Sequence, residues 1–264
     1  MDWFLFSIIS VIAGAIASIL SRVLMKDQDS DPMSYAIVFQ LLCTIFIFLF
    51  ALWNGFVMPP IAQYPFNFLI LAILYALGSV FILKAYQLSE ASEVIIVTSS
   101  RAIPAIIAGM IVLGEIFTPV QALGAILIFV AIVLINLKNK RLKITKGNLY
   151  ALAFAVCFGL AVVNDKYVMV TSQTEAISYT AVAFLLPTLL LIVTNPKSIL
   201  KSKHFLKLSM LMKMVLLCVF YSISAICFYL AFQYGANASQ LTPIAQSGVI
   251  LTVILSAIFL NERD

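Results

Sequence analysis

The stretch "YALGSVFILKAYQLSEAS" (residues 75–92) returns in the second half of the chain as "YSISAICFYLAFQYGANAS" (residues 221–239). Apolar helices align easily by chance, so matched polar and turn residues, such as Gln87 with Gln233, carry the comparison. The two stretches lie 146 positions apart at their start and 147 at their end, after a one-residue insertion. This spacing indicates an internal repeat that covers about half of the chain.

The composition indicates that both halves have lipid as their solvent. Of 264 residues, 63% are hydrophobic and 10% are charged, whereas soluble domains carry about 25% charged residues. Unbroken apolar runs of about 20 residues favour membrane-spanning helices over a barrel, which needs short alternating segments. The chain is therefore predicted to be an all-α, polytopic membrane protein. Nine spans are expected, at residues 3–21, 35–53, 66–86, 94–113, 120–137, 149–163, 177–193, 210–232 and 241–260.

These spans divide into two inverted repeats. We expect a first repeat of five helices over residues 1–140 and a second over residues 147–264. An odd number of spans per repeat gives the two halves opposite orientations in the membrane. After "IVLGE", which ends at Glu115, the first half continues with a turn and a helix, whereas the second half stops soon after the matching Glu262. The tenth span is therefore expected to be missing.

Basic residues predict the orientation, because short cytoplasmic connections collect Lys and Arg. The even-numbered connections contain only Lys166. The odd-numbered connections contain Arg22, Lys26, Lys84, Lys138, Lys140, Arg141, Lys143, Lys146, Lys197, Lys201, Lys203 and Lys207. We therefore expect a multi-pass protein of the plasma (inner) membrane with its N-terminus outside. The net charge of +5 then needs no nucleic acid as a partner.

Enzymatic chemistry has little support in the sequence. We find no His, Cys, Asp and Glu cluster at metal-ligand spacing, no glycine-rich phosphate loop and no nucleophile elbow. The four cysteines lie within apolar spans, where cysteine usually packs as a small hydrophobic residue. We expect a protein that is not an enzyme, with no catalytic residues, no cofactor and no metal.

Three motifs occur in an order typical of one transporter group: "LKAYQLSEAS", "RAIPAIIAGMIVLGEIFTPVQALGAILI" and "FQYGANASQLTPIAQSGVILTVILSAIFLNER". With their duplication, they resemble the drug/metabolite transporter superfamily, EamA type, along essentially the whole chain. The resemblance implies a ten-helix carrier of small organic solutes with a central cavity between its repeats.

Arg101 is the most informative candidate site residue, because it lies about 10 Å along the predicted fourth helix. In one interpretation its side chain extends to the cytoplasmic headgroups, or pairs with Glu93 or Asp165. In the other, its guanidinium faces the cavity and binds an anionic group of the solute, such as a carboxylate.

The other candidate substrate-binding residues are Thr98, Gln40, Thr242, Gln246, Tyr75 and Tyr221. Thr, Ser and Gln in membrane helices more often connect helices to one another, and tyrosines near span ends more often form the interfacial belt. The motif "VVNDKYV" places Asp165 and Lys166 near the expected end of the sixth helix. We interpret that pair as an interfacial cap or a local ion pair rather than a proton relay.

The function favoured by these patterns is transport of a small organic metabolite, amino-acid-like or otherwise anionic or zwitterionic, by alternating access. The expected partners are this solute and the lipid bilayer. Formation of a homodimer is left as an open alternative. The alternative is a multispan membrane scaffold or assembly protein without transport activity, which would contain no solute cavity.

The predicted orientation is testable by cysteine labelling. Cysteines placed at Lys140 and Lys203 should not react with an impermeant reagent added outside intact cells, because both connections are expected inside. Ready labelling at these positions would show that the orientation is the reverse of the predicted one.

Overall fold

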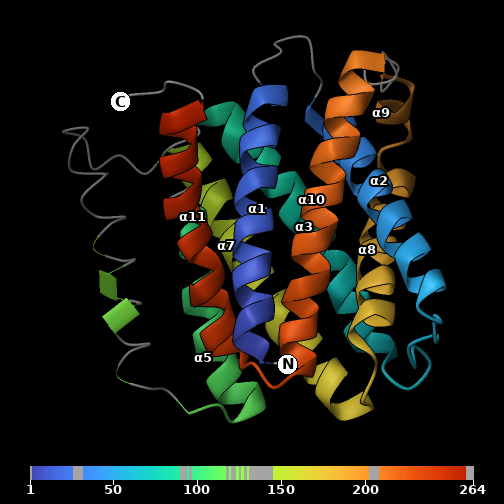
Figure 1. Cartoon of the computed structure of the whole chain (residues 1–264), viewed down its shortest axis with the longest axis vertical. Helices are drawn as coiled ribbons and strands as arrows, with labels where there is room; N and C mark the ends of the chain where they lie inside the picture. Colours follow the sequence, from blue (N-terminus) through green and yellow to red (C-terminus); the bar gives the residue numbers. More distant parts are fainter. Residues whose placement is uncertain are drawn as a thin grey trace.

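The computed structural model describes residues 2–25, 32–89, 94, 97–116, 119, 123–124, 126–127, 130, 145–201 and 208–259. In these ranges the chain forms helices and no strands (Figure 1). The helices are α1 (Trp3–Met25), α2 (Pro32–Trp53), α3 (Pro65–Leu88), α5 (Ala102–Leu113), α7 (Lys146–Ser172), α8 (Ala176–Thr194), α9 (Pro196–Lys201), α10 (Leu208–Gln233) and α11 (Ala238–Phe259).

The predicted all-α, membrane-spanning fold is confirmed. In the described part of the chain, α1, α2, α3, α7, α8 and α10 each contain an apolar segment long enough to cross a membrane. The predicted fourth span appears as a shorter apolar helix over Val97–Leu113, and α11 covers most of the predicted ninth span. Most of the predicted fifth span, residues 120–137, lies outside the described residues.

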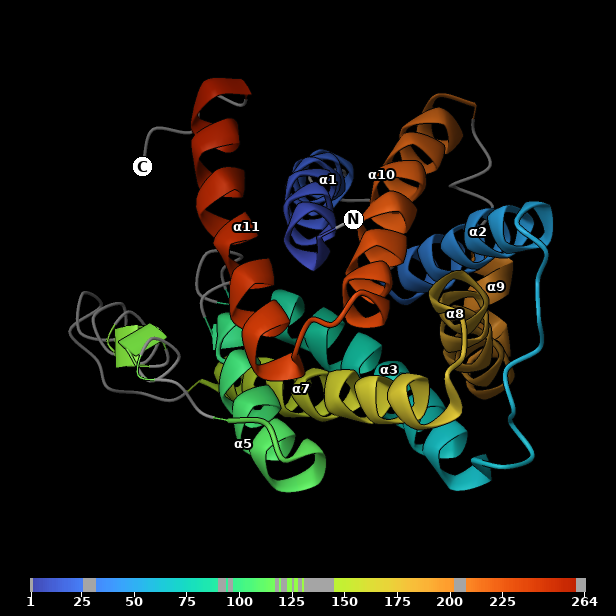
Figure 2. The ribbon, with the colours of Figure 1, turned by 60° about the horizontal axis from the view of Figure 1, so that its bottom comes forward.

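The helices contact one another in a pattern that is preserved when the two predicted halves are exchanged. Figure 2 shows α1 beside α10 and α11, and α7 beside α3 and α5. Exchanging α1 with α7, α3 with α10 and α5 with α11 turns the first group of contacts into the second. The contact between α5 and α11 is unchanged by this exchange. The contact between α2 and α8 is likewise unchanged when those two helices are exchanged. Inverted repeats would produce this pattern.

The ends of the helices alternate between two ends of the bundle. The N-terminus, the α7–α8 connection and the α10–α11 connection lie at the lower end in Figure 1. The end of α1, the start of α2 and α9 lie at the upper end. Corresponding helices of the two predicted halves therefore run in opposite directions.

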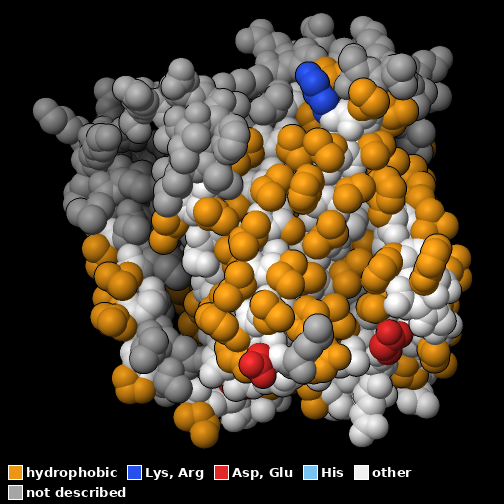
Figure 3. Space-filling model, in the orientation of Figure 1, with side chains coloured by type: hydrophobic (Ala, Val, Ile, Leu, Met, Phe, Trp, Pro, Cys, Tyr) orange, Lys and Arg blue, Asp and Glu red, His pale blue; other side chains and the backbone are white. Residues whose placement is uncertain are grey.

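Hydrophobic side chains cover the surface between these ends. On the face shown in Figure 3, the visible charged side chains lie near the top and the bottom of an apolar belt. Large apolar side chains are highly exposed, including Ile111 at 79% and Phe66 at 77%. A surface of this kind is expected where lipid tails are the solvent.

Small residues bring the helices close together, because membrane helices associate through packing and hydrogen bonds rather than through a hydrophobic driving force. Between α1 and α10, the Ser10 hydroxyl donates to the Ser224 carbonyl (2.8 Å), and the Ser224 hydroxyl donates to the Ser10 carbonyl (2.7 Å). Between α5 and α7, Gly159 lies directly against the backbone at the start of α5. A Cβ atom at Gly159 would lie 2.7 Å from both the Arg101 carbonyl oxygen and the Pro104 Cγ.

We predict that Gly159→Ala separates the start of α5 from α7 and lowers the melting temperature in detergent. Overpacking of this kind costs about 1–3 kcal/mol. Gly248→Ala is the matched control, because a Cβ there would meet its nearest neighbours at 3.6 and 3.7 Å, an ordinary contact distance. Equal melting temperatures for Gly159→Ala and the wild type would show that the α5–α7 contact is not close.

Candidate functional site

Arg101 lies inside the helix bundle, immediately before α5. Its backbone is helical (φ −56°, ψ −20°), and its amide donates to the Thr98 carbonyl at 3.1 Å. The guanidinium carbon lies 4.5 Å from the centre of the Phe158 ring on α7, within the range of a cation–π interaction. With its amide oxygen turned toward the arginine, Gln246 of α11 accepts hydrogen bonds from Nε and from Nη2, the latter at 3.0 Å.

Tyrosines from two more helices surround this arginine. Tyr75 and Tyr86 of α3 and Tyr221 of α10 are its electrostatic neighbours. The Phe158 ring under the guanidinium also lies edge-on to the Tyr75 ring, with centres 5.5 Å apart. Arg101 is therefore enclosed by helices of both predicted halves, and its side chain is half-buried.

Carboxylates do not balance the charge of Arg101 in the part of the chain that the structure describes. Asp165, one of the two predicted acidic partners, forms its hydrogen bonds with tyrosines instead. The other, Glu93, lies outside the described residues. The described partners of the guanidinium are thus a neutral amide and an aromatic ring.

The second polar cluster is centred on Asp165, which is completely buried. Its Oδ2 accepts hydrogen bonds from the hydroxyls of Tyr75 (2.6 Å) and Tyr229 (2.7 Å), and its Oδ1 accepts one from Tyr179 (2.8 Å). The Tyr75 and Tyr229 oxygens lie 3.2 Å apart. We call Asp165, Tyr75, Tyr179 and Tyr229 the aspartate–tyrosine cluster.

The interpretation of Asp165 and Lys166 as an interfacial cap or ion pair is wrong. The predicted sixth span ended at residue 163, whereas α7 continues to Ser172 and carries both side chains inside the bundle. Lys166 does not lie in a connection but turns toward the end of α10, where its Nζ donates to the carbonyls of Ala236 (2.5 Å) and Phe232 (3.4 Å). Polar residues did not end the helix, because their partners are supplied by neighbouring helices.

The remaining predicted residues are placed less centrally. Tyr221 packs edge-on against Phe39, with ring centres 4.9 Å apart. Thr242 is buried, and its hydroxyl donates to the Ala238 carbonyl of its own helix at 2.8 Å. Thr98 and Gln40 are half-buried. The structure thus brings together Arg101, Gln246, Tyr75 and Tyr221. The Thr242 hydroxyl instead forms its hydrogen bond within α11.

Side chains also tie together the connections at the lower end of the bundle. Gly114, with φ 64°, ends α5 in a left-handed turn, and the next residue, Glu115, reaches the start of α11. Its two carboxylate oxygens accept hydrogen bonds from the amides of Ala238 and Ser239, each at 2.8 Å. Gln233 of α10 similarly accepts from the amide of Ala176, the first residue of α8, at 2.8 Å. A carboxylate at a helix N-terminus satisfies unpaired donors and favours the helix dipole.

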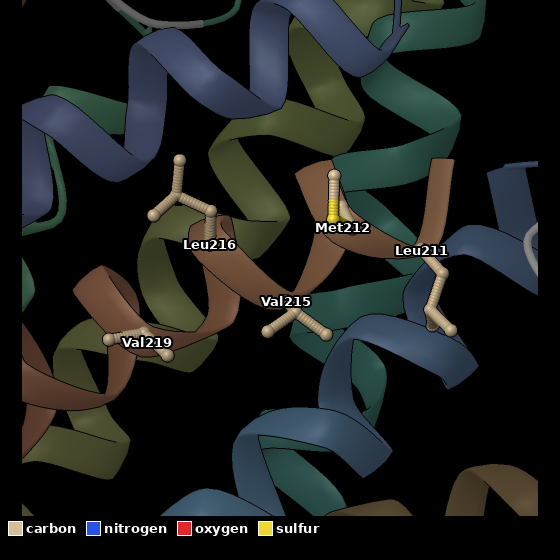
Figure 4. Close-up of a pocket in the computed structure, with 5 residues that line it drawn as sticks. All are labelled: Leu211, Met212, Val215, Leu216 and Val219. Carbon is tan, nitrogen blue, oxygen red and sulfur yellow. The ribbon is translucent and has the colours of Figure 1, made fainter. Parts of the chain in front are cut away.

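Two hollows lie on the outside of the bundle and have apolar linings. One lies along α10 and is lined by Leu211, Met212, Val215, Leu216 and Val219 (Figure 4). The other is bounded by side chains of α2, α8 and α10, including Phe46, Ile177 and Ile226. Their linings suit lipid tails rather than a charged solute.

We predict that Glu115→Ala speeds amide hydrogen exchange at Ala238 and Ser239 about fivefold, because loss of a helix cap costs about 1 kcal/mol and about 1.4 kcal/mol corresponds to tenfold. Glu175→Ala is the control at the same end, because that carboxylate accepts from the Ser178 hydroxyl (2.8 Å). Unchanged exchange at both amides in Glu115→Ala would contradict the capping contact.

Comparison with known proteins agrees with a transport function. The sequence model of the EamA-like transporter family matches residues 1–137 and 145–263. A solved structure titled "Crystal structure of protein" is similar to this chain with a TM-score of 0.75 at 14% identity, covering 98% of this chain and 88% of that one. A search of curated proteins finds no match. The chain therefore belongs to the EamA-like transporter family and is an integral, multi-pass membrane protein that transports small solutes.

Proposed function

We propose that this chain carries a small organic solute with a carboxylate group, amino-acid-like or otherwise anionic or zwitterionic, across the plasma (inner) membrane by alternating access. One observation supports this proposal most strongly. Arg101 lies between helices of the two predicted halves, and its described partners, Gln246 and the Phe158 ring, carry no negative charge. A guanidinium inside a membrane-spanning bundle without a counter-charge is costly, so a negatively charged group of a solute is a fitting partner.

The hydrogen bonds of Arg101 leave one side of the guanidinium for such a group. An arginine has five N–H donors in a planar fork. Gln246 takes the Nε hydrogen and one hydrogen of Nη2, and Phe158 covers one face of the plane. The edge formed by Nη1 and Nη2 can then bind both oxygens of a carboxylate.

The position of this edge suits a carrier. Arg101 precedes α5, in the proposed first repeat (residues 1–140), whereas Gln246 and Phe158 lie on α11 and α7, in the proposed second repeat (residues 147–264). A solute bound at Arg101 would contact both repeats, so movement of one against the other would expose it to either side. The contact of Glu115 with the amides of Ala238 and Ser239 joins the two proposed repeats at the lower end and fits a state closed at that end.

A scaffold without transport activity needs neither a solute site nor a change of access. An arginine kept only for folding should tolerate replacement by another polar residue wherever the bundle still assembles. The two functions therefore differ in the expected behaviour of Arg101 variants.

We predict that Arg101→Lys and Arg101→Gln lower the saturable uptake of the transported acid at least about tenfold in proteoliposomes. One charge-assisted hydrogen bond is worth about 1.5–3 kcal/mol, and about 1.4 kcal/mol is tenfold in affinity. A lysine keeps the charge but not the planar fork. The assay uses a labelled panel of amino acids and other small carboxylic acids.

Lys84→Gln is the matched control, because it removes an exposed cation of α3, which lies 5.3 Å from the Tyr150 ring. Its uptake should equal that of the wild type. Normal uptake by both Arg101 variants at unchanged expression would show that Arg101 is not part of the solute site. Absence of saturable uptake in the wild type for the whole panel would favour the scaffold.

A further inference from the structure

We propose that Asp165 is a proton-binding site, and that binding of a proton there couples solute movement to a proton gradient. The coupling rests on the transport function proposed above, whereas the proton site itself does not. The aspartate–tyrosine cluster carries this inference, because it holds a buried carboxylate with hydroxyl groups alone.

The charged and titratable groups around Asp165 come from most of the helices packed nearby. α3 supplies Tyr75, α8 supplies Tyr179 and α10 supplies Tyr229, all as hydrogen-bond donors. At the start of α5, Arg101 faces the Phe158 ring, and the described range of α11 contains no ionisable residue. Lys166 of α7 donates hydrogen bonds to carbonyls at the end of α10, and Glu115 is its electrostatic neighbour.

Among the described residues, no cation therefore forms an ion pair with the Asp165 carboxylate. A carboxylate removed from water without a cation keeps its charge only through hydrogen bonds, and a proton is the smallest group that removes the charge. Three charge-assisted hydrogen bonds hold the ionised form. The two forms thus differ by one proton and have the same surroundings.

The hydroxyl positions satisfy both forms. When the carboxylate is ionised, each tyrosine hydroxyl directs its single hydrogen to a carboxylate oxygen. When a proton binds Oδ2, that oxygen can donate to the Tyr229 oxygen at 2.7 Å, and Tyr229 can turn its hydrogen to the Tyr75 oxygen at 3.2 Å. Tyr179 donates to Oδ1 in both forms. The cluster can therefore gain or lose a proton without moving its heavy atoms.

The same hydrogen bonds connect the proton to the arrangement of the two halves. Tyr75 belongs to the proposed first repeat, whereas Asp165, Tyr179 and Tyr229 belong to the second. Protonation turns the charge-assisted bond from Tyr75 to Asp165 into a weaker neutral one. It therefore weakens a contact that holds the halves together near the lower end.

The proposed solute site lies close to this contact. The Phe158 ring lies 4.5 Å from the Arg101 guanidinium carbon and edge-on to the Tyr75 ring, with ring centres 5.5 Å apart. Phe158 and Asp165 are seven residues apart on α7, so they lie on one face of the helix about 10 Å apart along its axis. A carboxylate bound at Arg101 and a proton bound at Asp165 would thus act on the same tyrosine.

Infrared difference spectroscopy of the protein in lipid tests the proton site without any solute. Acidification from about pH 9 to about pH 4 reaches the point at which ordinary carboxyl groups are about half protonated. It should produce, within the protonated-carboxyl C=O band, a component that is absent in Asp165→Asn. Tyr179→Phe should move this component to higher frequency, because Oδ1 loses its donor. Asp2→Asn, which changes an exposed carboxylate, is the matched control and should keep the component.

Identical difference spectra for Asp165→Asn and the wild type would overturn the proton site. If Asp165→Asn does not fold, an unchanged carboxyl band in Tyr179→Phe overturns it in the same way.

Transport in proteoliposomes tests the coupling. With equal concentrations of an exchanged panel acid on both sides, an imposed pH difference should make the wild type accumulate it. Asp165→Asn should exchange labelled for unlabelled acid but not accumulate it. Accumulation by Asp165→Asn, or accumulation by the wild type with a sodium gradient only, would overturn the coupling.

Loss of both exchange and accumulation in Asp165→Asn would also overturn it, because Asp165 would then serve solute binding or folding. Absence of exchange in the wild type instead contradicts the proposed transport function, and the infrared result stands by itself.

Discussion

Charge inside a membrane-spanning bundle needs a partner, and this requirement governs the centre of the structure. Lipid tails offer no hydrogen bonds, so each buried ionisable group is satisfied by protein, water or solute. Lys166 is satisfied by carbonyl groups at the end of α10, and Asp165 by three tyrosine hydroxyls. Arg101 differs from both, because its described contacts with Gln246 and Phe158 leave the edge formed by Nη1 and Nη2 for a further partner.

Close helix packing determines where these charges lie. Gly159 allows the start of α5 to touch α7, which brings Arg101 over the Phe158 ring. The same helix, α7, carries Asp165 two turns further on, where helices of both proposed repeats converge. One helix therefore contributes to the proposed solute site and to the proposed proton site, and both include a contact with the other half of the chain.

Hydropathy predicted the helices well, because long apolar runs have one stable form in a membrane. It ended the sixth span too early, at residue 163, because a hydropathy pattern treats Asp165 and Lys166 as the water boundary. The partners of Asp165 lie at positions 75, 179 and 229, and their sequence spacing gives no sign that they meet. Arg101 and Gln246 were recognisable as polar residues in apolar spans, but their direct contact depends on packing between α5 and α11.

Binding of a carboxylate at Arg101 is the central claim, and ligand-induced thermal stabilisation tests it most directly. A ligand at 100 times its Kd stabilises the folded state by about 2.7 kcal/mol. The account predicts that at least one amino acid or small carboxylic acid raises the melting temperature of the wild type. The methyl ester of the same compound should not do so, and neither should the acid with Arg101→Gln. Equal stabilisation by acid and ester, or full stabilisation of Arg101→Gln by the acid, would contradict the account.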